Sequence, residues 1–334
     1  MPPIPERELT EPIDLCVPPG RLNPRAVGWS RRPIITADLG RWGRRKRWEY
    51  WAVMSPEAVL AVTISDLDYA GLYAIWFATR DGAEHGATAL APLPRLAMPE
   101  RAGGGPVQVR TKDVDISLTP GASAGDSLRI RATGGGVEAE LLIADPASSE
   151  SMGVVVPWSA RRFQYTVKET CLAARGTVTA DGVRHEFGED SWATWDFGRG
   201  KWPYRIDWNW GSGAGRQPDG RLIGLQFGGK WTDGTPMTEN AIFLDGRCFK
   251  ISQPVRWHYR QDDWLAPWHL DTPDGQVTLE FRPHHVRTDR TNLGVLANDT
   301  HQCFGTWHGT VDLPDASVEV DGLRGWAEEV RNRW

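Results

Sequence analysis

The sequence lacks the features that mark several large protein classes. None of its apolar runs approaches the roughly 18 residues that a membrane helix needs, so the sequence predicts no membrane span. The N-terminus has no basic start followed by an apolar stretch, and we therefore expect no secretory signal. The cysteines are widely spaced, without a Cys-x-x-Cys pair, which is typical of reduced thiols and predicts a cytoplasmic protein. They are Cys16, Cys171, Cys248 and Cys303.

Motifs for common cofactors and catalytic nucleophiles are also missing. The glycine-rich run 211–215 leads to another turn and a strand, whereas a phosphate-binding loop needs the start of a helix. No Gly-x-Ser-x-Gly elbow marks a serine hydrolase. The C-terminal histidines, which include His301 and His308, fall in none of the patterns that hold zinc. We therefore expect neither a metal nor a cofactor.

The charge balance argues against a nucleic-acid partner. The formal net charge is −5 at pH 7, and the main basic run is Arg44-Arg45-Lys46-Arg47. In an acidic chain such a run is typical of a solvated loop, which is how we interpret it. The sequence does not predict an oligomeric state.

Turn signals dominate what is present. The chain contains 36 glycines and 24 prolines without a repeating period, and 18 tryptophans against 6 tyrosines. Asp-Gly favours two-residue hairpins because glycine tolerates the positive φ of primed turns. Between these turns lie β-branched and aromatic runs with a period of two, such as 276–281. The Asp-Gly pairs lie at 81–82, 181–182, 219–220, 233–234, 245–246, 274–275 and 321–322.

This pattern predicts an all-β protein. Strands joined by hairpins form antiparallel sheets that close into barrels or pack as sandwiches. Only the segment 323–334 has helical spacing, with Trp326, Val330 and Trp334 near one face, so we expect one short C-terminal helix.

The stretch 198–203 interrupts the strand pattern and predicts a domain boundary. We expect an N-terminal domain, 1–200, and a C-terminal domain, 201–334. Residues 18–32 are rich in arginine, asparagine and tryptophan, and we expect them to form an ordered arm on the first domain.

Aromatic and acidic residues are densest between positions 171 and 213. If 191–197 is a strand, Trp192, Thr194 and Asp196 share one face. Indole rings supply rigid apolar walls, and a carboxylic acid among them can hold its proton near neutral pH and act as a general acid. The sequence therefore predicts a lined pocket in this region.

Asp196 is the first candidate for the catalytic acid, and Asp207, in the next predicted strand, is the second. A structural ion pair, for example with Arg199 or Arg205, is the alternative for both carboxylates. The candidate ligand-binding residues are Trp192, Trp195, Arg199, Trp208, Asn209, Trp210 and Glu239.

Three further acidic positions have simpler explanations. Glu239 precedes a predicted strand, 241–244, and we expect it at a solvent-exposed rim. Asp66 and Asp68 directly follow an apolar strand, where turn chemistry accounts for them better than a shared site does. Asp233, before Gly234, is likewise best explained as a turn residue.

The whole chain resembles a largely bacterial family described only as a domain of unknown function, DUF2804. That family brings no established activity. The shared phrases are Gly20-Arg21-Leu22-Asn23-Pro24, Arg47-Trp48-Glu49-Tyr50-Trp51, Pro157-Trp158-Ser159, 196–204, Trp208-Asn209-Trp210 and Lys230-Trp231-Thr232-Asp233-Gly234.

More distantly, the order Gly176, Asp181-Gly182, Trp192, Asp196 and Trp208 is similar to the signature of carotenoid 1,2-hydratases and AttH-like proteins. That superfamily has paired lipocalin-like barrels. The resemblance implies two lipocalin-like antiparallel β-barrel domains, an apolar pocket, and a carboxylate near Asp196 that protonates an alkene or ring. Three residues separate Trp192 from Asp196 here, where the signature has one, so Trp195 is an alternative anchor.

Three functions fit these features. The first is a cofactor-free acid–base enzyme, such as a hydratase, cyclase or isomerase, that acts on an apolar small molecule. The second is a carrier for a lipid-like ligand, in which the tryptophans provide affinity alone. The third is a carbohydrate-active protein, in which Asp196 and Asp207 would have to face each other across an open cleft.

Overall fold

The computed structural model describes residues 6–18, 20–94, 96–123, 127–145, 149–292, 294 and 296–333. The chain divides into two compact units. Glu8–Trp202 is the N-terminal unit, and Pro203–Trp334 together with Met1–Arg7 is the C-terminal unit. Each has its own cluster of buried apolar side chains. The predicted all-β class is confirmed, and each unit contains a curled half-barrel sheet.

The N-terminal unit is built on one antiparallel sheet in the order β10-β11-β12-β13-β15-β17-β6-β7-β8-β9, which β14, β16 and β4 extend. β4 pairs with β14, so the N-terminal arm joins the sheet through a strand. The elements are β1 (Ile13–Asp14), β2 (Cys16–Val17), β3 (Arg21–Leu22), η1 (Pro24–Ala26), β4 (Trp29–Ser30), β5 (Ile35–Thr36), β6 (Arg45–Met54), β7 (Ala58–Asp66), β8 (Ala70–Thr79), β9 (Glu84–Pro92), β10 (Val107–Arg110), β11 (Asp115–Thr119), β12 (Leu128–Gly134), β13 (Val137–Ile143), β14 (Met152–Ser159), β15 (Arg162–Ala180), β16 (Val183–Phe187) and β17 (Trp192–Lys201).

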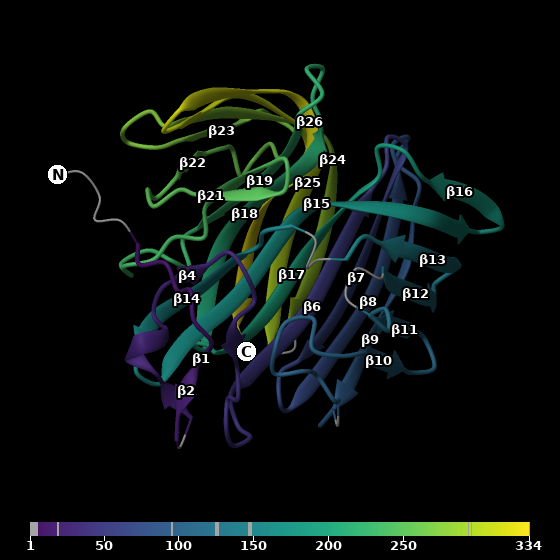
Figure 1. Ribbon diagram of the computed structural model, residues 1–334. Coiled ribbons are helices and arrows are strands. Elements are labelled where there is room, and N and C mark those ends of the chain that lie inside the picture. The colour runs from purple at the N-terminus through teal and green to yellow at the C-terminus, as the bar shows by residue number, and fades with distance from the viewer. Residues whose placement is uncertain are drawn as a thin grey trace. The chain divides into compact units, whose positions relative to one another are not determined.

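The long strand β15 changes partners along its length, as Figure 1 shows. Its first half pairs with β14 and β17, and its second half pairs with β13 and β16. The register with β17 shifts between Glu169 and Leu172, where Cys171 adopts a φ of 65°. A bulge of this kind bends a strand, and it lets β15 serve two parts of the curled sheet.

The C-terminal unit contains a nine-stranded sheet, within the described residues, in the order β21-β20-β19-β18-β26-β25-β24-β23-β22. Part of the predicted boundary, Gly198–Lys201, is the end of β17. Among the described residues, no helix has the length and apolar character needed to cross a bilayer. The strands are β18 (Arg205–Arg216), β19 (Leu222–Gly229), β20 (Ala241–Leu244), β21 (Arg247–Lys250), β22 (Arg256–His258), β23 (Trp268–Asp271), β24 (Val277–Asn292), β25 (Ala297–Leu313) and β26 (Ala316–Arg333).

Most Asp-Gly pairs lie in turns, but one does not. Asp181 and Asp245 have positive φ, as do the glycines that follow them, and they connect β15 to β16 and β20 to β21. Asp321-Gly322 instead lies inside β26, opposite the single residue His308 of β25. It is a β-bulge, in which Gly322 has a φ of 65°.

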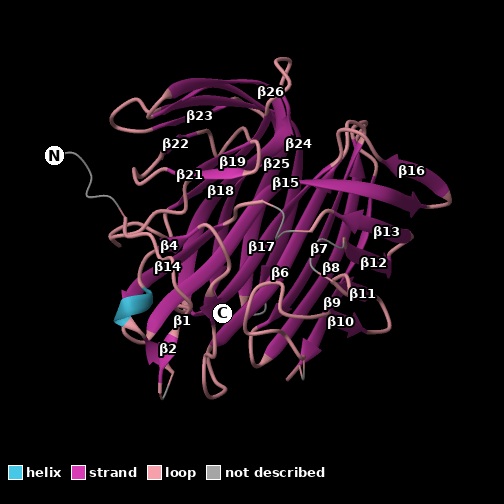
Figure 2. Ribbon diagram, in the orientation of Figure 1, coloured by secondary structure: helices cyan, strands magenta, loops and turns pink. Residues whose placement is uncertain are grey.

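The predicted C-terminal helix is wrong, because residues 323–333 are the end of β26 (Figure 2). Trp334 lies outside the described residues. Trp326 and Val330 are four residues apart, a spacing that places side chains on one face of a helix and also on one face of a strand. β26 pairs with β18 on one side and β25 on the other. Burial between two long strands therefore decides the conformation.

Because β26 is central to its sheet, Trp326→Ala should be strongly destabilising. Trp326 is 1% exposed, and removal of a buried indole costs about 3–5 kcal/mol. Trp42, which is 62% exposed and donates one hydrogen bond, is the matched control, and its replacement by alanine should cost about 1 kcal/mol or less. Urea denaturation measures both variants, and equal midpoints would contradict a buried central strand.

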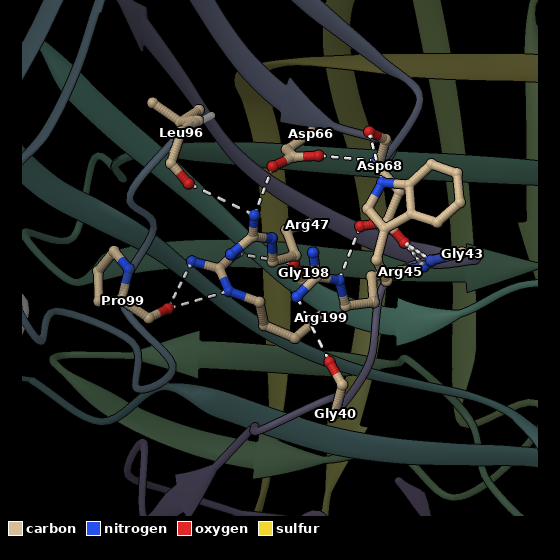
Figure 3. Close-up of polar contacts among 11 residues, drawn as sticks. Gly40, Gly43, Arg45, Arg47, Asp66, Asp68, Leu96, Pro99, Gly198 and Arg199 are labelled. Atoms are coloured by element: carbon tan, nitrogen blue, oxygen red, sulfur yellow. Dashed lines mark hydrogen bonds and ion pairs between the residues drawn. The ribbon is translucent and has the colours of Figure 1, made fainter. Parts of the chain in front are cut away.

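The basic run is also not a solvated loop. Arg45 and Arg47 begin β6, and ion pairs join them to Asp68 and Asp66, respectively (Figure 3). The Asp68 carboxylate also accepts the backbone N–H groups of Gly43 and Arg45, and Asp66 accepts that of Asp68. The two aspartates therefore combine turn chemistry with ion pairs.

Lys46, between these arginines, gives the unit a pH dependence. Its side chain is buried against Tyr69, and burial lowers its pKa from 10.5 to about 7, against the opposing charge of Asp68. Burying the protonated amine therefore destabilises the folded state. This destabilisation is complete below about pH 7 and disappears above pH 10.5. Stability should rise with pH across this window.

Lys46→Met should remove that rise, and it should raise stability at pH 7 more than at pH 10. Urea midpoints measured at both pH values test this, with Lys112→Met at an exposed position as the control. A wild type and a Lys46→Met variant with parallel pH profiles would show that the Lys46 amine keeps its ordinary pKa.

Candidate functional site

The predicted residues of β17 lie on two faces of the sheet. Trp195 and Phe197 pack in the core of the N-terminal unit, and Arg199 shares their face. Asp196 and Trp192 lie on the opposite face, because side chains alternate along a strand. Asp196 and Arg199 therefore cannot act in one pocket of this unit.

Asp196 is held in a buried polar network. Its carboxylate lies 2.8 Å from the Lys168 ammonium and accepts a hydrogen bond of 3.0 Å from Thr166. The side chains of Asp196 and Lys168 are only 9% and 5% exposed. Asp196 therefore forms a structural ion pair, the alternative to a catalytic role, but its partner is Lys168 and not Arg199 or Arg205.

Arg199 lies fully buried and uses all its donors on protein acceptors, of which Figure 3 shows Pro99 and Gly198. Its five N–H groups bond to the backbone oxygens of Trp48, Pro99 (twice) and Gly198 and to the Glu49 carboxylate. Burial raises the pKa of Glu49, against the effect of Arg199, and lowers the pKa of Arg199 to about 10. A guanidinium with every donor occupied has none left for a ligand.

Trp195 completes this network. Its indole N–H donates to Glu49 at 2.8 Å, and its ring stacks on Trp51 with centroids 5.3 Å apart. Trp192 is 9% exposed, at the start of β17. The aromatic density predicted as a pocket wall therefore contributes here to a packed core.

The predicted residues of β18 also divide between two faces. The Trp208 indole donates to Glu328, and the Trp210 indole donates to Gln226 and lies edge-on to Trp326. Asp207 and Asn209 lie on the other face of the sheet.

Glu239 is not at an exposed rim, because it is only 2% exposed. Its carboxylate accepts a bond from the Trp231 indole at 3.3 Å. The expected exposure of Glu239 is therefore wrong.

Asn209 belongs to a polar group that the sequence did not predict, which we call the tyrosine cluster: Asn209, Lys230, Tyr259, Gln261 and Glu329. Asn209 of β18 pairs in register with Glu329 of β26. Lys230 directly follows β19 and has a φ of 65°, and Tyr259 directly follows β22. β19, β18 and β26 are neighbours in the sheet, whereas β22 is an edge strand, so the curl of the sheet brings Tyr259 to the other residues.

The Tyr259 hydroxyl is the centre of the cluster. It donates to Glu329 in a short hydrogen bond, and it accepts bonds from Lys230 at 2.9 Å and from Asn209 at 3.2 Å. Lys230 also lies 3.2 Å from Glu329, and Gln261 donates to the same carboxylate. The side chain of Glu329 is 3% exposed and that of Lys230 is 36% exposed, so the cluster opens to solvent at the lysine.

These contacts assign the protons. Burial and the bond to Glu329 raise the pKa of Tyr259, against the effect of Lys230. Burial pushes the pKa of Glu329 upward, but Tyr259, Lys230 and Arg331 together hold it below its ordinary value. At neutral pH the phenol therefore keeps its proton and Glu329 stays ionised.

Aromatic rings fix the position of the phenol. Tyr259 stacks on Trp268 with centroids 4.1 Å apart and an interplanar angle of 11°. Trp264 lies beside the same ring and stacks on His301 at 4.1 Å. Burial lowers the pKa of His301, against the charge of Asp299. The hydroxyl is thus presented by a rigid wall.

A polar groove of about 490 Å³ adjoins the cluster, and we call it the arginine groove. It is lined by the ends of β18, β24, β25 and β26, and Asp207 is one of its lining residues. Arg331, also in the lining, lies 2.6 Å from Glu329 and so links the groove to the cluster. A volume of this size suits a small-molecule ligand.

Local patterns did not reveal the cluster. Lys230 belongs to a phrase singled out in the sequence, but Glu329 lies in the segment predicted as a helix. Seventy residues separate Tyr259 from Glu329. Within the described ranges, no group of three or more histidine, cysteine or acidic residues is arranged to hold a metal.

The ion pair of Asp196 makes a testable prediction. Asp196→Asn leaves Lys168 buried without its carboxylate partner and should destabilise the protein by about 3–5 kcal/mol. The double replacement Asp196→Leu with Lys168→Met removes both charges and should recover much of that loss. Urea denaturation distinguishes these cases, and an Asp196→Asn variant as stable as the wild type would contradict the structural role.

Comparisons with known structures agree with this fold. CghA bound to Sch210972 has a TM-score of 0.55 at 12% identity, over 90% of this chain and 89% of that one. The structure of a protein described as an AttH from Nitrosomonas europaea has a TM-score of 0.51 at 12% identity, over 95% of this chain and 98% of that one. Kievitone hydratase from Nectria haematococca has a TM-score of 0.52 at 11% identity, over 86% of this chain and 88% of that one. At these identities the likeness shows the fold alone, and this fold agrees with the lipocalin-like architecture that the distant resemblance implied.

A search of curated protein sequences finds no significant match. The family model described as a domain of unknown function (DUF2804) matches residues 6–334, nearly the whole chain. The chain therefore belongs to the DUF2804 family.

Proposed function

We propose that the protein is a cofactor-free acid–base enzyme that acts on a small molecule, with Tyr259 as the proton donor. The observation that carries the proposal is the convergence of Asn209, Lys230 and Glu329 on the Tyr259 hydroxyl. A phenol loses its proton readily only where the resulting phenolate is stabilised, and Lys230 and Asn209 both donate to that oxygen.

The contacts define a path for the proton. Tyr259 gives its proton to the substrate, and Lys230 and Asn209 stabilise the phenolate. Lys230, the more exposed residue of its pair with Glu329, then returns a proton to the phenolate. The protonated substrate adds a water molecule or loses a proton from another atom, and the proton released in that step restores Lys230 through the solvent. Glu329 holds the hydroxyl in place before the transfer and balances the charge of Lys230.

Two observations support a hydratase, cyclase or isomerase type of reaction. Proton transfer is the chemistry that these side chains provide, and one of the similar folds is a hydratase by name. The ring of Trp264, which is partly exposed beside Tyr259, favours a substrate with an apolar part. Asp196, which is tied to Lys168, is less suited to give up a proton.

Deuterium incorporation tests the proposal without a known substrate. The purified protein is incubated in deuterated water with a small-molecule extract of the organism that encodes it. Wild-type protein should add deuterium to at least one compound, as seen by mass spectrometry. Tyr259→Phe keeps the ring stack and should slow this exchange by about 10²–10⁴-fold.

Tyr204→Phe, at an exposed tyrosine of the same unit, is the matched control and should exchange at the wild-type rate. Equal exchange by wild type and Tyr259→Phe would contradict the role of Tyr259. Recovery of an unmodified ligand from the wild-type protein, with no exchange into any compound, would instead identify a carrier.

A further inference from the structure

The arginine groove contains two rows of side chains that differ in charge balance. Strand register defines both rows across β18, β26, β25 and β24. The inner row is Asp207, Arg331, Asp299 and Arg290. The outer row is Arg205, Arg333, Ala297 and Asn292. All eight residues line the groove.

The inner row is electrically balanced. Acidic and basic residues alternate across the four strands, and Arg290 lies 2.9 Å from Asp299. Arg331 lies 2.6 Å from Glu329, at the edge of the tyrosine cluster. Each positive charge of this row therefore has a carboxylate beside it.

The outer row carries two positive charges and no acid. Arg205 and Arg333 are directly opposite each other on β18 and β26. Like charges at opposite positions in a sheet repel and destabilise the pair. Arg205 makes no ion pair or hydrogen bond with the described residues, and Arg333 makes one bond of 3.4 Å to Asn292.

Arg333 has a second unusual feature. Its Nε atom is buried and has no hydrogen-bond acceptor among the residues that the structure describes. An unsatisfied buried donor of a charged group is costly, so Arg333 is held in the outer row at an energetic cost. The unbalanced charge and the unused donor occur at the same place.

We propose that Arg205 and Arg333 bind the oxyanion group, a carboxylate or a phosphate, of a small molecule in the arginine groove. Guanidinium groups present parallel donors that match the oxygens of either anion. The positive charges of the inner row already have carboxylates beside them, so an anionic group is attracted more strongly to the outer row. The rest of the ligand then extends past Arg331 toward Tyr259.

The identification of this ligand as the substrate of Tyr259 rests on the proposed function, whereas the anion site itself does not. The proposed substrate is amphiphilic: an oxyanion binds in the outer row, and an apolar part lies against the aromatic wall. Binding at the groove itself requires no turnover, so it can be measured independently of catalysis.

Isothermal titration calorimetry with three naphthalene probes tests the site. The probes are 1-naphthoate, 1-naphthyl phosphate and the uncharged 1-naphthylmethanol. The wild-type protein should bind at least one anionic probe about tenfold more tightly than the alcohol. The stronger of the two anions identifies the oxyanion that the groove prefers.

Arg205→Gln, Arg333→Gln and the double variant should each weaken anion binding, by about tenfold for a single change, and leave binding of the alcohol unchanged. Arg247→Gln, at an exposed arginine outside the groove, is the control and should bind all probes as the wild type does. Failure of both anions to bind more tightly than the alcohol would overturn the proposal, as would unchanged binding in the double variant.

Tyr259→Phe separates this proposal from the proposed function. This variant should keep the affinity of the anionic probes while losing deuterium exchange. Arginine-dependent binding together with exchange that is independent of Tyr259 would sustain the anion site and reject the catalytic role. Deuterium exchange that depends on Tyr259, without arginine-dependent binding, would sustain the catalytic role and reject the anion site.

Discussion

Asn209 of β18 and Glu329 of β26 are opposite each other in register, and the rest of the candidate site depends on this pairing. Two residues further along the same face, Asp207 is opposite Arg331, and beyond them Arg205 is opposite Arg333. Because residues of one face recur every second position, a single register sets the tyrosine cluster, the balanced row and the unbalanced row in sequence. A slip of one residue would exchange this face for the tryptophans of the other.

Charged groups are satisfied to different degrees around β17 and in the candidate site. In the N-terminal unit, Arg199 has five protein acceptors, and Asp196 is paired with Lys168. Charged groups whose hydrogen bonds and ion pairs are all made within the protein stabilise a unique arrangement, and they have few donors or acceptors left for a ligand. In the C-terminal unit, Lys230 is partly exposed and Arg205 has no acid beside it. Incomplete satisfaction, rather than the amount of charge, distinguishes the candidate site.

The sequence predicted local features well and long-range ones poorly. The period of two and the Asp-Gly turns identified an all-β chain, because both depend on a few neighbouring residues. The bulge at Asp321-Gly322 and the end of β26 were misjudged, since a positive φ serves a turn or a bulge and a spacing of four suits a helix or a strand. Tyr259 and Glu329 meet because the sheet curls and brings its edge strand β22 close to β26, which no local pattern encodes.

The surroundings of Tyr259 explain why we propose a phenol, rather than an aspartate, as the proton donor. Beside Trp268 and Trp264, Tyr259 is held in a stack that fixes the direction of its hydroxyl. A carboxylate at that position would be repelled by Glu329, whereas a neutral phenol can donate to it. Lys230, with its backbone in the left-handed region, then completes the hydrogen bonds of the same oxygen. The proposed proton donor is therefore a residue whose neutral form the surroundings favour.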